Sequence, residues 1–367
     1  MDKLRSSDCT CDVHGYANLI SANIYNILGI SFFFLVFLLF ISGCKPQDPM
    51  VLLKGKTMGT TYLVRYLPDD ASIDKDALHK LIDSKLKSIN NIMSTYIPDS
   101  ELSILNTSKE GKYKISDELL NLLILSKNYN ALSKGSFDVT VGPVVNLWGF
   151  GPNGKRIVPG DEKIKDALSK VGSEKFELVK NENLIIKKTS ELYIDLSSNA
   201  KGWGVDEIAK LLRSKNIKNF LVEIGGEIKA EGKKPSGNWT VAIENPSEEI
   251  RGVQKVLGFK GAMATSGSYR NYFKSNGHWF SHTINPKTGR PVEHKLLSVT
   301  VLDEKSCAVA DTLSTTLMVM GPEIGLDFAE RHGIAAYFIT LQEQTGQKEG
   351  TFVETQTSHF KDYLNKI

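Results

Sequence analysis

The segment that most constrains the fold runs from Cys307 to Met320 and reads CAVADTLSTTLMVM, with Asp311 as its single charged residue. A helix that is apolar on most faces must be buried, and a buried carboxylate needs a compensating partner. Thr315 follows four residues later, so both side-chain oxygens project from one helix face. Together with a backbone carbonyl, they suit a hard cation such as Mg²⁺ that is shared with phosphates. A cap or an ion pair to a neighbouring loop would also stabilise Asp311, and both interpretations are open.

The segments around this helix mix strands and helices without regular alternation, which favours an α+β fold over a doubly wound sheet. Hydrophobic periodicity predicts long helices over Asp74–Met93 and Asp117–Leu132, the second capped by Ser116. Shorter helices are expected over Asp161–Lys170, Lys201–Ser214, Ala308–Met320 and Pro322–His332. Strands are expected over Gly55–Leu67, near Phe176, Ile185 and Ile194, and over Phe220–Ala230, Trp239–Glu244, Val256–Thr265, His278–Thr283, Leu297–Leu302 and Ala336–Thr340. We expect one catalytic unit over residues 55–342 and a mobile tail over 343–367.

The amino end carries an apolar run from Ile27 to Ile41. This run is short for a membrane-spanning helix and suits the h-region of a secretory signal. It ends in Ile41-Ser42-Gly43-Cys44, which looks like the lipobox of a bacterial lipoprotein. We therefore expect a signal peptide over residues 1–43, a lipidated Cys44, and a tether over 44–54 that holds the protein on a membrane facing the periplasm. A transmembrane anchor with a chance cysteine is the less favoured alternative.

Composition narrows the classes of function. The 367 residues are 41% hydrophobic and 24% charged, the balance of a folded globular protein. The net charge is +3, and no dense run of Lys or Arg occurs. We therefore expect no nucleic-acid partner.

Two polar segments could contribute to a site. Asp195 ends a predicted strand, and the small polar residues after it lead into a helix that begins near Lys201. This places Lys201 at the positive end of a helix, where anions bind, although capping by Asp195 or Ser197 with a solvated Lys201 explains the same pattern. His282 lies at a strand end before the turn Asn285–Gly289, where a histidine suits a general base. A lone histidine is more often structural.

Two glycine-bearing segments also stand out. The Gly-Gly pair within Glu223–Glu227 indicates a bulge or a close approach of a ligand, and Thr265–Arg270 offers hydroxyls and backbone amides. Taken together and in order, the polar segments resemble the ApbE family of FAD:protein FMN transferases. The matching positions are Met58–Thr60, Tyr96, Gly135–Asp138, Asp195–Asp206, Glu223–Gly226, Thr265–Gly267, His282–Gly289 and Ala310–Thr315.

The resemblance implies an α+β fold and Mg²⁺-dependent transfer of FMN from FAD to a Thr or Ser hydroxyl of an acceptor protein, with AMP released. Asp311, Thr315 and the carbonyl of Ser198 match the metal ligands, and His282 matches the proposed base, so His282 and Asp311 are the expected catalytic residues. The positions that match the family's FAD site are Met58, Tyr96, Ser136, Phe137, Asp138, Asp195, Lys201 and Ile284.

Acceptors in the family are subunits of sodium-pumping quinone reductases (Nqr) or of Rnf-type complexes, and the resemblance implies such a partner here. Two alternatives remain. A Mg²⁺-dependent FAD pyrophosphatase would use the same site with water as the acceptor. A non-enzymatic flavin-binding lipoprotein would need neither the Asp311–Thr315 pair nor a base.

Overall fold

The computed structural model describes residues 50–68, 74–152, 154–246, 252–268, 271–342 and 351–366. The expected signal peptide, lipobox and Cys44 lie outside these ranges. Across the described ranges, none of the helices combines the length and the apolar character needed to span a bilayer. Residues from Met50 onward form one unit, and the account below concerns that unit.

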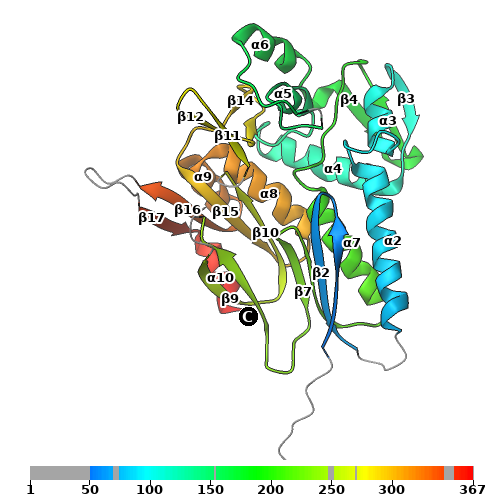
Figure 1. Cartoon of the computed structure of the whole chain (residues 1–367), viewed down its shortest axis with the longest axis vertical. Helices are drawn as coiled ribbons and strands as arrows, with labels where there is room; N and C mark the ends of the chain where they lie inside the picture. Colours follow the sequence, from blue (N-terminus) through cyan, green and yellow to red (C-terminus); the bar gives the residue numbers. More distant parts are fainter. Residues whose placement is uncertain are drawn as a thin grey trace, which may run out of the picture. The chain divides into compact units, whose positions relative to one another are not determined.

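An eight-stranded sheet forms the centre of the unit, in the order β1-β2-β6-β7-β10-β15-β16-β17 (Figure 1). Every neighbouring pair in it is antiparallel. Its strands are β1 (Val51–Thr57), β2 (Thr60–Leu67), β6 (Asn219–Ile224), β7 (Glu227–Glu231), β10 (Gly261–Gly267), β15 (Leu296–Asp303), β16 (Ala335–Gln342) and β17 (Thr351–Gln356). With the helices that pack on it, this sheet confirms the α+β class.

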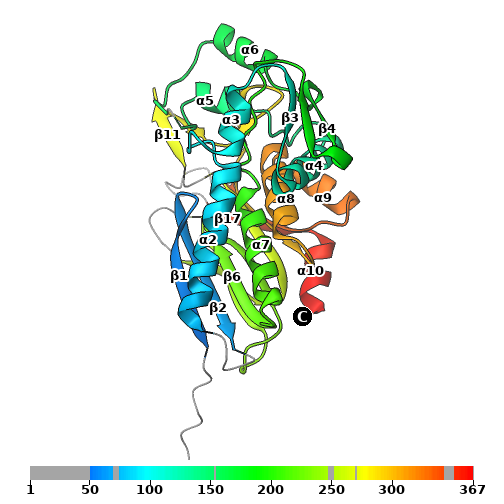
Figure 2. The ribbon, with the colours of Figure 1, turned by 90° about the vertical axis from the view of Figure 1, so that its right-hand side faces the viewer.

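The two faces of the sheet are covered by different elements (Figure 2). Helices α2 (Lys75–Met93), α7 (Ala200–Ser214), α8 (Cys307–Met320) and α9 (Pro322–Arg331) cover one face. The hairpin of β8 (Trp239–Glu244) and β9 (Val253–Phe259) and the helix α10 (Ser358–Asn365) cover the other. Side chains alternate accordingly along β6: Phe220 and Val222 pack toward the helices, whereas Leu221 packs toward the hairpin.

A second layer lies beyond one end of the large sheet and carries two smaller cores. One core joins α3 (Glu101–Thr107) and α4 (Asp117–Leu132) to the sheet β3 (Gly111–Lys114), β5 (Leu184–Lys187) and β4 (Phe176–Val179), with 3₁₀ turns at Ser173–Lys175 and Lys180–Glu182. The other joins α5 (Gly142–Leu147) and α6 (Asp161–Ser169) to the hairpins β11–β12 (Tyr272–Ser275, His278–Ser281) and β13–β14 (Ile284–Asn285, Arg290–Pro291).

Three stretches expected as single strands are each divided in two. Gly55–Leu67 turns at Met58-Gly59, with φ of 47° and 70°, and Phe220–Ala230 turns at Gly225-Gly226, with φ of 61° and 106°. Val256–Thr265 breaks before Gly261, with φ of 113°, and passes from the β8–β9 hairpin into the central sheet. Period-two alternation does not distinguish one strand from two strands that a tight turn joins.

Two further expectations differ from the structure. The predicted strand at Ile194 is an extended connection outside any ladder, because the side-chain amide of Asn106 takes both backbone hydrogen bonds of Ile194, each over 2.8 Å. The sequence analysis also predicts a mobile tail over residues 343–367. The structure instead pairs β17 with β16 and buries Phe360 of α10 against Tyr337, with ring centroids 5.4 Å apart.

Candidate active site

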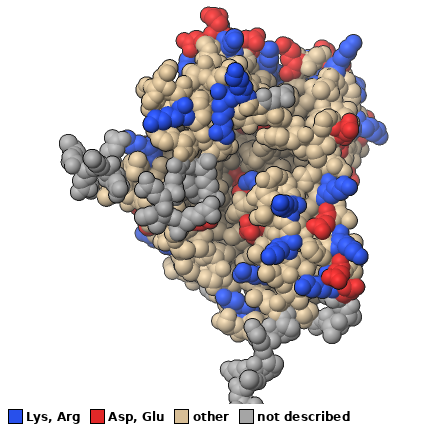
Figure 3. Space-filling view, in the orientation of Figure 1, with Lys and Arg blue, Asp and Glu red and all other residues tan. Residues whose placement is uncertain are grey.

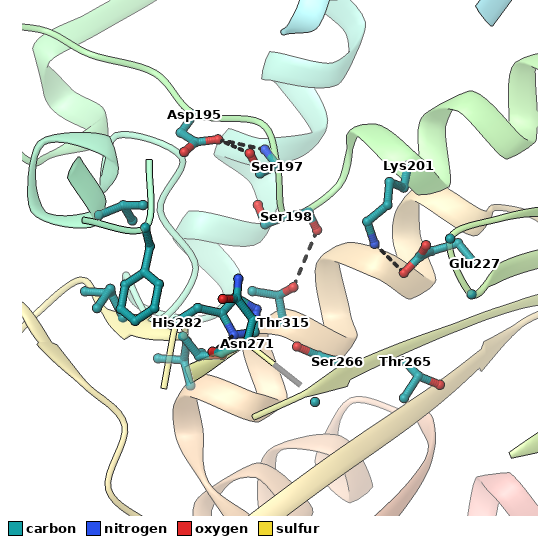
Figure 4. Close-up of a pocket in the computed structure, with 18 of the residues that line it drawn as sticks. Asp195, Ser197, Ser198, Lys201, Glu227, Thr265, Ser266, Asn271, His282 and Thr315 are labelled. Atoms are coloured by element: carbon teal, nitrogen blue, oxygen red, sulfur yellow. Dashed lines mark hydrogen bonds and ion pairs between the residues drawn. The ribbon is translucent and has the colours of Figure 1, made fainter. Parts of the chain in front are cut away.

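A cavity of about 710 Å³ lies where the two layers meet, and it appears as a hollow in the surface view (Figure 3). Its walls come from the turn between β6 and β7, from β10, from the start of α7, from α8, and from the loops around α5 and β12. The expected site residues among its lining are Tyr96, Asp195, Ser198, Lys201, His282, Ile284 and Thr315. Segments far apart in the chain therefore converge on one cavity, as Figure 4 shows.

Two of the three residues expected to bind a cation, Ser198 and Thr315, line this cavity, whereas Asp311 is not among its lining. The hydroxyl of Thr315 donates a hydrogen bond of 3.4 Å to the carbonyl of Ser198. Asp311 lies one helical turn before Thr315 on α8 and is 4% exposed. One carboxylate, one hydroxyl and one carbonyl are ligands that Mg²⁺ accepts, so the residues present fit the metal that the resemblance implies.

Asp311 also joins two helices. Its Oδ2 accepts a hydrogen bond of 2.9 Å from the backbone N–H of Gly202 in the first turn of α7. A Cβ on residue 202 would lie 2.4 Å from the carbonyl oxygen of Cys307, so glycine is what allows the helices to approach this closely. Burial raises the pKa of Asp311, and the nearby ammonium of Lys201 opposes that rise. Asp311 thus also caps a backbone N–H group, in the first turn of α7.

Lys201 is not a solvated lysine. Its Nζ lies 2.5 Å from Oε1 of Glu227, whose side chain is only 2% exposed. Burial lowers the pKa of Lys201, but the carboxylates of Asp311 and Glu227 outweigh this effect and raise it, so the ammonium stays charged. Glu227 lines the cavity, and the sequence analysis did not select it as a site residue. The acid directly after a Gly-Gly turn was the signal that could have identified it.

The turn Gly225-Gly226 is a hairpin turn rather than the expected bulge, and both residues line the cavity. A Cβ at Gly225 would lie 2.8 Å from Cγ2 of Thr60 and 3.3 Å from Cδ of Lys201. At Gly226 a Cβ would meet nothing within 4 Å, and its φ of 106° is what requires glycine. The turn therefore places backbone without side chains at the cavity wall, and the expected close approach of a ligand stays a prediction.

His282 follows β12 directly, as the predicted position at a strand end requires. Its Nδ1 lies 3.0 Å from the backbone carbonyl of Asn271. A carbonyl only accepts hydrogen bonds, so Nδ1 carries the proton and Nε2 carries the lone pair. Burial lowers the pKa of His282, with Lys201 and Arg156 acting in the same direction. A neutral imidazole with an available Nε2 is what a general base needs.

Arg156 holds the segment that orients His282. Its guanidinium donates to the carbonyl of Tyr272 over 2.9 Å and to the side-chain oxygen of Asn271 over 2.8 Å. Asn271 in turn accepts from both the backbone N–H and Nδ1 of His282. Neither Arg156 nor Asn271 was selected from the sequence, because their role depends on contacts between segments more than a hundred residues apart.

The two acids of the segment Asp195–Asp206 have distinct roles. Asp195 accepts from the backbone N–H and hydroxyl of Ser197, at 2.9 and 2.6 Å, so it braces its own loop at the cavity edge. It does not cap α7, whose N-cap is Asn199. Asp206 is not part of the cavity lining and accepts hydrogen bonds of 3.0 Å from the backbone N–H groups of Cys307 and Ala308. Asp206 therefore fixes the start of α8.

Four residues expected at the FAD site do not line the cavity: Met58, Ser136, Phe137 and Asp138. Met58 packs between the cores of α2 and α4, and Phe137 is 2% exposed within the core of α4. Asp138 accepts from the backbone N–H and hydroxyl of Thr140, at 2.8 and 2.6 Å. These side chains support the loops that border the cavity.

Comparisons with known proteins identify the family of the chain. The model of the ApbE family matches residues 58–338. The FAD:protein FMN transferase of Vibrio cholerae is 44% identical over 334 residues, which span 90% of this chain and 97% of that protein. Its counterpart from Haemophilus influenzae is 42% identical, over 88% and 93%.

Solved structures of ApbE flavin transferases also resemble this chain. The flavin transferase ApbE from Vibrio cholerae superposes with a TM-score of 0.76 at 42% identity, covering 85% of this chain and 98% of that one. The apo form of the flavinyl transferase ApbE from Pseudomonas stutzeri superposes with a TM-score of 0.78 at 38% identity, covering 86% and 97%.

Proposed function

The chain belongs to the ApbE family, whose matched relatives are FAD:protein FMN transferases, and we propose that it transfers FMN from FAD to a Thr or Ser hydroxyl of an acceptor protein. The FMN phosphorus forms a phosphoester with the hydroxyl oxygen, its bond to the bridging oxygen of the diphosphate breaks, and AMP leaves. The observation that carries this proposal is the meeting of the Thr315 hydroxyl with the Ser198 carbonyl in the cavity that also holds His282.

A divalent cation fits this chemistry. The carbonyl of Ser198, the hydroxyl of Thr315 and the carboxylate of Asp311 would hold Mg²⁺, and the metal would supply charge neutralisation at the diphosphate. The charges of the cavity support this requirement. Its described lining holds the acids Asp195, Glu223, Glu227 and Glu244 but one lysine, Lys201. Such a lining would repel a diphosphate without a cation.

His282 supplies the proton acceptor. The Nδ1 proton is held by Asn271, so Nε2 is the atom that takes the proton from the acceptor hydroxyl as that oxygen attacks. Lys201 contributes positive charge at the start of α7, and Glu227 holds the ammonium in place. Apolar side chains on the α5 side of the cavity, Val141, Val145 and Ile284, offer a surface for an aromatic ring.

The test mixes the full-length protein with FAD, Mg²⁺ and a candidate acceptor. A suitable acceptor is the flavin-free domain of a sodium-pumping quinone reductase or Rnf-type subunit that carries the target Thr or Ser. Flavin fluorescence on the acceptor band, with one AMP released per flavin attached, is the expected result. Replacement of the target Thr of the acceptor by Val is the matched control and should abolish the signal. Free FMN and AMP in equal amounts, without flavin on the acceptor, would identify a pyrophosphatase and contradict the proposal.

We also propose that Cys44 anchors the protein to a membrane facing the periplasm. The apolar run Ile27–Ile41 and the Ile41–Cys44 motif support this proposal. Attachment by a lipid and a short tether would keep the active site near acceptors that are themselves membrane subunits. The prediction for Cys44 in the Discussion tests the anchor independently of the chemistry.

A further inference from the structure

Glu227 carries a carboxylate oxygen that the proposed chemistry leaves unused. Its Oε1 lies 2.5 Å from Nζ of Lys201, whereas its Oε2 is buried and has no hydrogen-bond partner in the described part of the chain. The side chain is 2% exposed and lines the cavity. Buried polar atoms in folded proteins are nearly always paired. A group that enters the cavity is therefore expected to pair with Oε2.

The position of Glu227 indicates which part of the substrate this group belongs to. In the view of Figure 4, the Ser198–Thr315 pair lies between His282 on one side and the Lys201–Glu227 pair on the other. In an in-line displacement the attacking and leaving oxygens lie on opposite sides of the phosphorus. The attacking hydroxyl is on the side of His282, so the leaving AMP is on the side of Glu227.

We propose that Oε2 of Glu227 forms a hydrogen bond with a ribose hydroxyl of the AMP half of FAD. This inference rests on the proposed function, because the in-line argument assigns the AMP half to this end of the cavity. An anionic phosphate oxygen only accepts hydrogen bonds, so it could pair with Oε2 only when the carboxyl is protonated. A ribose hydroxyl both donates and accepts, and it pairs with a carboxylate in either protonation state.

The charges around Glu227 make it relevant that a ribose hydroxyl can both donate and accept a hydrogen bond. Burial raises the pKa of Glu227 to about 8, repulsion from Asp311 adds to the rise, and Lys201 opposes it. A carboxyl in this environment suits a partner that can both donate and accept a hydrogen bond. Ser266 and Thr265 of β10 also line the cavity, and the hydroxyl of Thr265 lies 2.8 Å from that of Thr300. Glu227 is therefore a buried group at the cavity wall with an oxygen left to bind a ligand.

The experiment measures the affinity of the full-length protein for AMP, for 2′,3′-dideoxy-AMP and for FMN by calorimetry in the presence of Mg²⁺. The wild type should bind the dideoxy nucleotide about ten- to a hundredfold more weakly than AMP, the loss expected for a hydrogen bond to a charged group. Glu227→Met should bind both adenine nucleotides with the same affinity. Its affinity for FMN should change less than its affinity for AMP.

Glu231→Met is the matched control. Glu231 lies on the same strand, pairs with Arg213 over 2.5 Å and is absent from the cavity lining, so this variant should keep the wild-type preference for AMP. Equal wild-type affinity for AMP and its dideoxy analogue would overturn the inference, and this arm needs no variant to fold. So would a preference that persists in Glu227→Met. The transfer assay scores the proposed function separately, because FMN can be transferred whether or not Glu227 contacts the ribose.

Discussion

Oδ2 of Asp311 accepts a hydrogen bond from the backbone N–H of Gly202 over 2.9 Å, which joins α8 to the first turn of α7. The contact brings the positive end of a helix to a buried carboxylate, one turn from Thr315. A single residue thus connects the packing of two helices with the turn of α8 before Thr315, which lines the cavity. Asp311 can be changed in its charge while this contact is kept, and that separation makes it the most informative position to test.

Asp311→Asn keeps a side-chain oxygen that can accept from Gly202 but removes the charge that a cation requires. We expect the thermal midpoint to change little and the transfer rate at limiting Mg²⁺ to fall by roughly tenfold or more. A Mg²⁺ titration of the rate measures the effect, and Asp327→Asn on the exposed surface of α9 is the control. Full transfer activity of Asp311→Asn in EDTA-treated buffer would defeat the metal assignment.

Thr315 offers a second, independent test of the same ligand set. Thr315→Ser retains the hydroxyl that meets the carbonyl of Ser198, whereas Thr315→Val retains the shape and loses the oxygen. We expect Thr315→Ser to stay within a few-fold of wild type and Thr315→Val to need about tenfold more Mg²⁺ for half-maximal rate. The same Mg²⁺ dependence in both variants would remove Thr315 from the ligands.

His282→Gln should bind FAD normally and transfer FMN about 10²- to 10⁴-fold more slowly, since only proton transfer is lost. The pH profile gives a second readout. Burial holds the pKa of His282 below its usual 6.5, so the imidazole is neutral at pH 7 and the wild-type rate should fall only as the pH drops below 6.5. Rates measured between pH 5 and 8 should show this acid limb in the wild type and not in His282→Gln. An acid limb that persists in the variant would assign it to another group.

A substitution of Asp206 tests how the start of α8 is stabilised and leaves the proposed chemistry aside. Its Oδ1 lies 2.8 Å from Nζ of Lys229, which is 6% exposed, and its oxygens receive the first N–H groups of the helix. Asp206→Asn leaves that lysine without its counter-charge, and we expect the free energy of unfolding to fall by about 3–5 kcal/mol. Asp327→Asn breaks an exposed ion pair and should cost about 0.5 kcal/mol or less. Denaturant unfolding of both variants makes the comparison, and equal losses would contradict it.

Cys44→Ser should lose the lipid and keep the uncleaved apolar run Ile27–Ile41, so the variant should run as a larger precursor than the wild type. The thiol is the atom that takes the lipid, and the apolar run before it is cleaved only if the motif is recognised as a lipobox. Metabolic labelling with a fatty acid should mark the wild type and not the variant. A wild type that takes no label, or a Cys44→Ser variant of the same size as the wild type, would favour the transmembrane alternative.

Much of the local structure could be predicted from the residues alone. The helices over 75–93 and 117–132 match the predicted periods almost to the residue, with Asp74 and Ser116 as their caps. Local signals of this kind depend on residues within one or two helical turns of each other. The same reasoning could not separate the hairpin β6–β7 from one strand, and it left the segment after 342 unplaced, because strand pairing is set by distant partners.

Residue types were enough to mark Asp311 as a buried charge in need of a partner, Lys201 as a cation at a helix start, and His282 as a titratable group beside a loop. What only the tertiary structure decided is which groups meet. The Ser198 carbonyl and the Thr315 hydroxyl are 117 positions apart, and the partner of Lys201 is Glu227, 26 positions away. Such pairings depend on how the helices and the sheet pack, and a carbonyl oxygen or an acid after a Gly-Gly turn carries no chemical signature until that packing brings it to the cavity.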